Sequence, residues 1–318
     1  MHIPGNELFM NFLRLIRWPN LLIVALVMVF MRFFLIIPKL EHFGIAVGST
    51  NITFILLIFS VLLIAAGGYI VNDIFDEVID RVNKPDQMLI GIKISHFKAW
   101  LYYWLLTGCG IISGFILAIL AMKPFFGMIF VLISIILFLY STWYKRQLIT
   151  GNILVSFSTA MVLVTTWIFE TIFIDTILIE NIDLQLVINE ISLFVYVYSF
   201  FAFCTSLLRE IVKDMEDIRG DEAAGCKTIP IYFGLSISKS IVFVLVLLLM
   251  IAVAFWQYLL LIKGFVICSS FLFLTQLISS ICLFRLLKAD DQISFHRLSF
   301  LLKILMISGI ASLTVLKF

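Results

Sequence analysis

Long apolar runs leave this chain of 318 residues little choice of fold. Each run has about 18 to 23 residues, enough to cross about 30 Å of hydrocarbon as an α-helix. The runs cover 20–38, 50–72, 99–120, 124–142, 152–173, 191–210, 239–261, 264–286 and 298–316. We therefore predict an all-α, multi-pass membrane bundle of about nine helices around a central apolar cavity, built as a single domain over residues 1–318.

Composition agrees with a membrane protein and excludes a water-soluble fold. Hydrophobic residues make up 63% of the chain and charged residues 13%, whereas about a quarter of an ordinary soluble domain is charged. The net charge is only +2 and no basic patch stands out, so we expect no nucleic-acid partner.

Lysine and arginine are distributed unevenly among the loops, which predicts the orientation. If the N-terminus is cytoplasmic, most of these residues lie in cytoplasmic loops, as the positive-inside rule requires. We therefore expect a multi-pass protein of the cell membrane whose N-terminal side faces the cytoplasm. The opposite side holds an acidic connection over 174–190, interpreted as a short interfacial segment without chemistry.

The segment before the first run has two interpretations. Residues 7–17 place Phe9, Phe12, Leu13 and Ile16 on one helical face, which favours an amphipathic helix on the membrane surface. A frayed extension of the first run is an equal alternative. No signal-peptide pattern precedes that run, so we expect it to remain in the mature protein.

Acidic residues gather in two short windows. Of the 20 aspartates and glutamates, 11 fall within 73–86 and 210–222. Both windows contain the spacing DxxDxxxD, at Asp73, Asp76 and Asp80 and again at Asp214, Asp217 and Asp221. On a continuous helix each triplet covers about 60° of surface. Because stacked like charges repel, the pattern predicts two carboxylate stripes that a divalent cation neutralises.

The position of the stripes indicates the substrate. Each follows an apolar run, and four crossings separate them, so both are expected on one side of the membrane. Oxygen ligands completed by phosphate oxygens suit Mg²⁺. An allylic diphosphate matches such a site, because its isoprenoid tail suits the apolar interior and its diphosphate suits the metal. The metal would stabilise the charge that develops on the leaving group, and aromatic faces can stabilise the carbocation.

These motifs resemble those of the UbiA superfamily of intramembrane prenyltransferases, over most of the chain. The first resembles the family's NDxxDxxxD, and the second its DxxDxxxD followed by a Gly-Asp-Glu-Ala-Ala-Gly run at 220–225. The resemblance implies a Mg²⁺-dependent prenyltransferase that takes a prenyl diphosphate and a membrane acceptor. It implies metal ligands at Asn72, Asp73, Asp76, Asp80, Asp214, Asp217 and Asp221.

A third element lies between the motifs. Tyr140 to Arg146, followed by Gly151 and Asn152, resembles the family's tyrosine-to-lysine element, which implies Lys145 on the diphosphate and Tyr140 near the reacting carbon. Lys145 and Arg146 also satisfy the positive-inside rule, which is the alternative. The catalytic set is expected to be Asp76, Asp80, Asp217, Asp221, Tyr140 and Lys145. The substrate-binding set is expected to be Asn72, Lys84, Lys93, Lys145, Arg146, Arg209 and Lys213.

One departure from the family concerns the phosphate-binding basic residues. After the first motif the family has an NRPxRP-like run, whereas this chain has Asn83-Lys84-Pro85-Asp86-Gln87-Met88, so the second arginine is missing. Lys84 and Lys93 are the expected substitutes. A weaker diphosphate site, or an inactive member of the family, is the alternative.

The acceptor is the least constrained prediction. The motifs are most similar to the branch that transfers a geranylgeranyl group from geranylgeranyl diphosphate to a phosphoglycerol lipid acceptor. An aromatic acceptor of the quinone, tocopherol or chlorophyll type is the alternative. A transporter also carries acids within its membrane region, but transport sites usually lie near the midplane and these acids follow the apolar runs.

Overall fold

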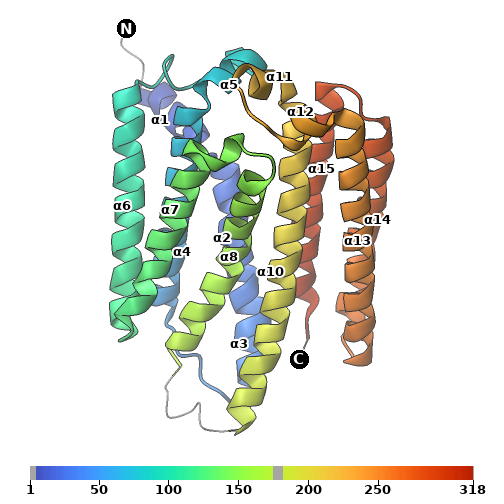
Figure 1. Cartoon of the computed structure of the whole chain (residues 1–318). Coiled ribbons are helices and arrows are strands. Elements are labelled where there is room, and N and C mark those ends of the chain that lie inside the picture. The colour runs from blue at the N-terminus through green and yellow to red at the C-terminus, as the bar shows by residue number, and fades with distance from the viewer. Residues whose placement is uncertain (1–4, 175–181, 318) are drawn as a thin grey trace. The chain divides into compact units, whose positions relative to one another are not determined.

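The computed structural model describes residues 5–174 and 182–317, and this part of the chain is helical with connecting turns (Figure 1). Within it, nine segments are long and apolar enough to cross a membrane. They are Trp18–His42, Asn51–Phe75, His96–Leu120, Pro124–Thr142, Thr150–Ile172, Leu184–Glu216, Leu235–Ile262, Val266–Lys288 and Gln292–Val315. Each overlaps one predicted run, so the all-α membrane architecture and the helix count are confirmed.

The first span is made of three consecutive helices, α2 (Trp18–Phe30), the π-helix η1 (Met31–Ile36) and α3 (Ile37–His42). The other long helices are α4 (Asn51–Phe75), α6 (His96–Leu120), α7 (Met128–Thr142), α8 (Thr150–Ile172), α10 (Ile182–Glu216), α13 (Leu235–Ile262), α14 (Val266–Lys288) and α15 (Gln292–Ala311). Shorter α-helices are α1 (Gly5–Leu15), α5 (Glu77–Asn83), α11 (Ile218–Ala223) and α12 (Ile229–Phe233).

Residue contacts group the chain into two compact units, which are described separately. Unit 1 comprises Met1–Leu26, Ser49–Gln147 and Arg219–Cys226. Unit 2 comprises Val27–Gly48, Leu148–Ile218 and Lys227–Phe318. The single domain and the central cavity expected from the sequence stay predictions. Within unit 2, a cavity of about 30 Å³ lies among residues of α10, α13, α14 and α15.

Unit 1 is built on the close pair α4 and α6. Thr50 caps α4, its hydroxyl accepting from the Thr53 amide at 3.2 Å, which satisfies one of the free N–H groups of the first turn. Further along, the Ser60 hydroxyl donates to the Gly110 carbonyl at 2.5 Å. A side chain on Gly110 would lie 3.1 Å from the Ser60 carbonyl. Small residues therefore let the two backbones approach closely, as is common between membrane helices.

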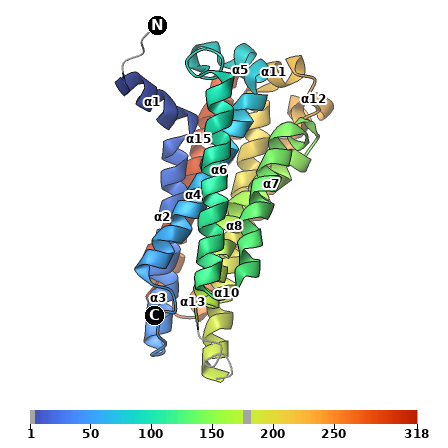
Figure 2. The same cartoon turned by 90° about the vertical axis from the view of Figure 1, so that its left-hand side faces the viewer.

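Helix α1 is separate from the first span, which favours the amphipathic interpretation of residues 7–17. Phe9 on α1 is exposed, whereas Leu15 is fully buried in a hydrophobic cluster that includes Ile70 of α4. Arg17 then adopts a left-handed backbone, with φ of 50°, before α2 begins. Figure 2 shows α1 at the same end of α4 and α6 as α5.

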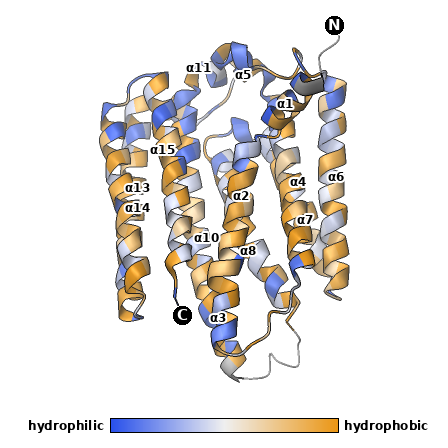
Figure 3. Cartoon of the chain, turned by 180° about the vertical axis from the view of Figure 1, so that it is seen from behind, coloured by the Kyte–Doolittle hydropathy of each residue, from blue (hydrophilic) through white to orange (hydrophobic). Residues whose placement is uncertain are grey.

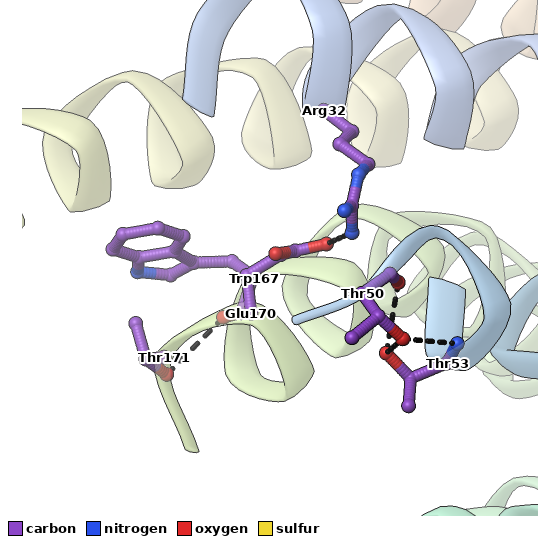
Figure 4. Close-up of polar contacts among 6 residues, drawn as sticks. All are labelled: Arg32, Thr50, Thr53, Trp167, Glu170 and Thr171. Carbon is purple, nitrogen blue, oxygen red and sulfur yellow. Dashed lines mark hydrogen bonds and ion pairs between the residues drawn. The ribbon is translucent and has the colours of Figure 1, made fainter. Parts of the chain in front are cut away.

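Unit 2 centres on α10, which packs against α8 and α15, while α13 packs against α14. An ion pair lies within it: Arg32 of η1 donates to Glu170 of α8, and both side chains are buried (Figure 4). Figure 3 shows hydrophobic colours along the long helices of each unit and hydrophilic colours on α5.

The acidic connection predicted over 174–190 is shorter than expected, because α10 begins at Ile182. Glu190, which the prediction placed in this connection, is helical and lies 2.7 Å from the Lys39 ammonium of α3. The prediction of a loop at Glu190 was wrong. Its charge lowered the hydropathy of the segment, but the ion pair with Lys39 lets Glu190 stand within α10. Asp175 and Glu180 lie outside the described residues.

Candidate active site

Both acidic motifs contain a helix break at their middle aspartate. Helix α4 ends at Phe75 and α5 begins at Glu77, so Asp76 stands between them. In the second motif α10 ends at Glu216 and α11 begins at Ile218, so Asp217 holds the same place. The prediction of a continuous helix through each motif is therefore wrong at Asp76 and Asp217. The break is local, because the Asp76 amide still donates to the Asn72 carbonyl at 2.9 Å and the Asp217 amide to the Lys213 carbonyl at 2.9 Å.

Asp76 of the first motif accepts hydrogen bonds from two side chains. It is buried at the end of α4. The Asn72 side-chain amide donates to Asp76 Oδ2 at 2.6 Å, and the Lys145 ammonium donates to the same oxygen. Lys145 of the tyrosine-to-lysine element therefore contacts the first motif within unit 1.

The Lys145 ammonium lies in an acidic environment. Burial lowers its pKa, but the Asp76 carboxylate raises it, and the net pKa lies well above the usual range. Tyr140, which is buried, and Asp221 of the second motif act in the same direction. Lys145 therefore stays charged at neutral pH, and its surroundings bring together one residue from each of the three sequence elements.

Asp221 is held in unit 1 by its neighbour Gly220. The Gly220 amide donates to Asn83 Oδ1 at 3.0 Å, which ties α11 to α5. A Cβ on Gly220 would lie 2.4 Å from the Asn83 side chain and 2.7 Å from the Ile79 carbonyl, so only glycine fits this contact. The sequence analysis gave neither Asn83 nor Gly220 a role, although both stand inside the motifs.

Arg17 is a member of this site that the sequence analysis missed. Its guanidinium donates to Asp73 Oδ1 at 2.6 Å and lies over the ring of Tyr69, 5.2 Å from the centroid. The Asp73 carboxylate raises the pKa of Arg17, so the guanidinium is permanently charged. The only sequence signal was that Arg17 follows Arg14 just before the first apolar run, and the positive-inside rule explains both arginines equally well.

Unit 2 carries the remaining residues of the second motif. The Asn152 amide of α8 donates to Asp214 Oδ2 at 2.8 Å, and Asp217 is buried. Arg209 donates to its neighbour Glu210 at 2.8 Å. Lys213 lies on α10 one residue before Asp214. Asn152 was named in the sequence only as part of a motif, and the structure makes it a direct partner of Asp214.

The other expected residues are less clearly placed. Asp80 and Lys84 are half-buried in unit 1, on or beside α5. Lys93 and Arg146 are exposed. The Arg146 charge lowers the pKa of the Cys226 thiol, whose net pKa is raised to about 11, first by burial and then by Asp221.

The donor atoms suit a hard divalent cation. They are carboxylate and amide oxygens, and Asn72 Oδ1 is buried without a hydrogen-bond partner. In the described ranges no three acidic, histidine or cysteine side chains form a ready metal cluster, and basic side chains pair with the carboxylates of Asp73 and Asp76. The residues fit Mg²⁺ once those basic groups are displaced.

A comparison with protein families decides the identity of the chain. Residues 42–304 match the model of the UbiA prenyltransferase family. The chain belongs to this family. Among UbiA relatives, the digeranylgeranylglyceryl phosphate synthase of Methanothermobacter thermautotrophicus is 32% identical over 187 residues. That alignment covers 58% of this chain and 58% of the relative, so the chain spans under two thirds of that protein's length.

Solved structures extend the similarity to nearly the whole UbiA fold. A structure from work on digeranylgeranylglyceryl phosphate synthase in membranes has a TM-score of 0.62 and 25% identity, covering 97% of this chain and 98% of that one. A UbiA homologue from Archaeoglobus fulgidus bound to DMAPP and Mg²⁺ has a TM-score of 0.56 and 18% identity, covering 96% and 100%.

Proposed function

We propose that this UbiA member transfers a geranylgeranyl group from its diphosphate to a phosphoglycerol-type lipid acceptor, with Mg²⁺. The observation that carries the proposal is the meeting of Asp76, Lys145 and Asp221 in unit 1. Three separate sequence elements supply one charged group each to this place. A site of this composition recognises a metal-bound diphosphate, and the carboxylates stand at helix ends, where a polar head group meets an apolar tail.

The residues divide into cation-holding and phosphate-holding groups. Mg²⁺ would be held by oxygens of Asn72, Asp73, Asp76, Asp80, Asp214, Asp217 and Asp221, and when bound it neutralises charge on the diphosphate leaving group. Lys145, which is half-buried and permanently charged, donates to a phosphate oxygen, and this contact strengthens as negative charge grows there. Lys84, Lys93, Arg146, Arg209 and Lys213 complete the proposed phosphate contacts.

Several residues act without touching phosphate. Asn152 orients Asp214, and Asn83 fixes Gly220 so that the Asp221 carboxylate stays near Lys145. Tyr140 is proposed to lie beside the reacting carbon, where an aromatic face stabilises positive charge. Ionisation would break the bond from C1 to the diphosphate oxygen and release diphosphate. The acceptor hydroxyl oxygen would form the new bond to C1, and its proton would pass to the departing diphosphate.

The acceptor and donor choices rest on the relatives. The Methanothermobacter thermautotrophicus protein is a digeranylgeranylglyceryl phosphate synthase, and the Archaeoglobus fulgidus homologue is bound to DMAPP and Mg²⁺. The loops that carry the motifs are rich in lysine and arginine. We therefore propose that the protein lies in the cell membrane with its site facing the cytoplasm.

A direct assay tests the proposal. The purified chain in lipid nanodiscs is given geranylgeranyl diphosphate, with geranylgeranylglyceryl phosphate and 4-hydroxybenzoate as parallel acceptors, and products are identified by mass spectrometry. We expect Mg²⁺-dependent product with the phosphoglycerol acceptor only. Product from the aromatic acceptor alone would reassign the branch, and full activity in excess chelator would contradict the metal-dependent mechanism.

Two matched variants localise the activity. Asp76→Asn is expected to lower turnover about a hundredfold or more, because it removes a metal ligand and the partner of Lys145. Asp290→Asn is the control, since Asp290 is exposed and pairs with Lys239 in unit 2. Its turnover is expected to match that of the unchanged chain.

A further inference from the structure

The sequence lacks an arginine after the first motif, and the structure brings another arginine to that motif. Arg17 comes from the junction between α1 and α2, about fifty residues earlier in the chain, and its guanidinium donates to Asp73 Oδ1 at 2.6 Å. The contact lies wholly within unit 1. An arginine at this place is close to where the proposed function puts the diphosphate.

The backbone at Arg17 is unusual for a residue with a side chain. Its φ of 50° lies in the left-handed region, which costs about 1 kcal/mol or more outside glycine and asparagine. The turn is held by the Arg17 amide, which donates to the Arg14 carbonyl at 3.0 Å, and by the Arg17 carbonyl, which accepts from the Asn20 amide at 2.8 Å. Glycine would fit this turn without strain, so the arginine side chain itself is the feature to explain.

The Arg17 side chain is held in place but remains partly exposed to solvent. Arg17 is 32% exposed and Asp73 is 16% exposed, and the guanidinium also lies over Tyr69. A guanidinium in this setting keeps donors available for a second anion, because it has five N–H groups in a planar fork. The same fork binds two phosphate oxygens at once.

A divalent cation on Asp73 would take up most of the negative charge that Arg17 now neutralises, and it would repel the guanidinium 2.6 Å from the same oxygen. We propose that Arg17 is a donor-binding residue that neutralises Asp73 while the site is empty and turns to the diphosphate when a divalent cation takes its place on Asp73. This inference rests on the proposed function. Arg17 would then replace the phosphate-binding arginine that is absent after the first motif. Lys145 pairs with Asp76 in the same way.

The proposal predicts opposite effects on two ligands. Removing the Arg17 charge frees Asp73 for the cation, so Arg17→Gln should bind Mn²⁺, measured by electron paramagnetic resonance without donor, about threefold more tightly. The same variant should bind geranylgeranyl thiolodiphosphate, an unreactive donor analogue, at least about tenfold more weakly in saturating Mg²⁺, because it loses charged hydrogen bonds to phosphate. Arg17→Lys keeps the charge, so its affinity for the analogue should lie between those of the unchanged chain and Arg17→Gln.

Arg14→Gln is the matched control, because Arg14 is exposed on the adjacent helix α1 and its loss removes the same charge. It should change neither affinity by more than about twofold. A merely structural role for Arg17 predicts weaker binding of both ligands and overturns the proposal. So does metal binding that is not tightened, or analogue binding that is not weakened. An unchanged chain that binds no analogue at all contradicts the proposed function itself, which distinguishes the two failures.

Discussion

Two arginine–carboxylate pairs of this chain have the same chemistry in different surroundings. Arg17 and Asp73 meet in unit 1 with side chains 32% and 16% exposed, whereas Arg32 and Glu170 meet in unit 2 with both side chains 2% exposed. Arg32 sits on a π-helix inside the first membrane span, and Arg17 stands just outside that span. One pair can exchange its partner for another ion, and the other cannot do so without leaving a charge in an apolar interior.

The difference teaches which charges serve binding and which serve assembly. A charge buried between membrane helices is costly unless it is paired. The Arg32–Glu170 pair therefore holds η1 against α8. A half-exposed ion pair contributes little to stability, so stability alone does not explain why Arg17 lies opposite Asp73. The position of Arg17 at the first motif is better explained by ligand binding.

Breaking the buried pair should give the largest effect. Arg32→Leu leaves the Glu170 carboxylate without its cation inside the membrane span, and we expect a loss of about 3 to 5 kcal/mol in the free energy of unfolding. Unfolding in mixed micelles, followed by circular dichroism, measures it. The double variant Arg32→Leu with Glu170→Leu should recover most of the loss. A double variant as unstable as the single one would show that the pair does more than neutralise itself.

Removing one acid from each pair should separate activity from stability. Asp73→Asn is expected to lower turnover about a hundredfold, equivalent to about 2.7 kcal/mol of barrier, with less than about 1 kcal/mol lost in stability. Glu170→Gln should do the reverse, keeping turnover per folded molecule within about threefold while unfolding more easily. Turnover and thermal unfolding are measured on the same nanodisc samples. Equal losses of turnover in both variants would refute the division.

Hydropathy was sufficient to predict the fold, because a membrane span needs only length and apolar composition. All nine predicted runs overlap spans of the described chain. The start of α10 was placed too late, since Glu190 reads as a loop residue until its ion pair with Lys39 is known. That pairing joins residues 151 positions apart, and no local pattern reports it.

The candidate site was predictable where spacing carries the signal. The motifs singled out Asp76, Lys145 and Asp221, and the structure places the Asp76 and Asp221 charges beside Lys145; their roles stay predictions. The helix breaks at Asp76 and Asp217 were not predictable from helical periodicity, which assumes an unbroken helix. Arg17 escaped because an arginine at a membrane boundary has an ordinary explanation, and its contact with Asp73 depends on how α1 folds back onto α4.

The Cys226 thiol offers a probe of the motif region that neither pair touches. Burial and the Asp221 charge raise its pKa to about 11 from an ordinary 9.0, so about one thiol in a hundred is ionised at pH 9, against one in two for an ordinary thiol. In a variant with only this cysteine, the rate of maleimide labelling should rise about tenfold per pH unit from 7 to 10.

The same shift makes the folded state less stable in alkali. The unfolded thiol loses its proton first, so the free energy of unfolding should decrease as the pH rises above 9.0 and level off above about 11. Lys145→Gln should slow the labelling further, because the Lys145 charge lowers the pKa of Cys226, whereas Arg32→Gln should leave it unchanged. A labelling rate that begins to level off near pH 9 would show an ordinary thiol and contradict the raised pKa of Cys226.

The smallest effect, and the most direct comparison of the two pairs, concerns salt. Screening shortens the range of charge interactions from about 10 Å at 0.1 M salt to about 3 Å at 1 M, but only where ions and water reach the charges. Double-mutant cycles with glutamine or asparagine at each position give the coupling free energy of each pair. We expect the Arg17–Asp73 coupling to be about 1 kcal/mol or less at 0.1 M NaCl and to approach zero at 1 M. The Arg32–Glu170 coupling should be larger and nearly independent of salt, because both side chains are buried. If salt lowered both coupling free energies equally, solvent would reach Arg32, and the two arginines would not differ in their ability to exchange partners.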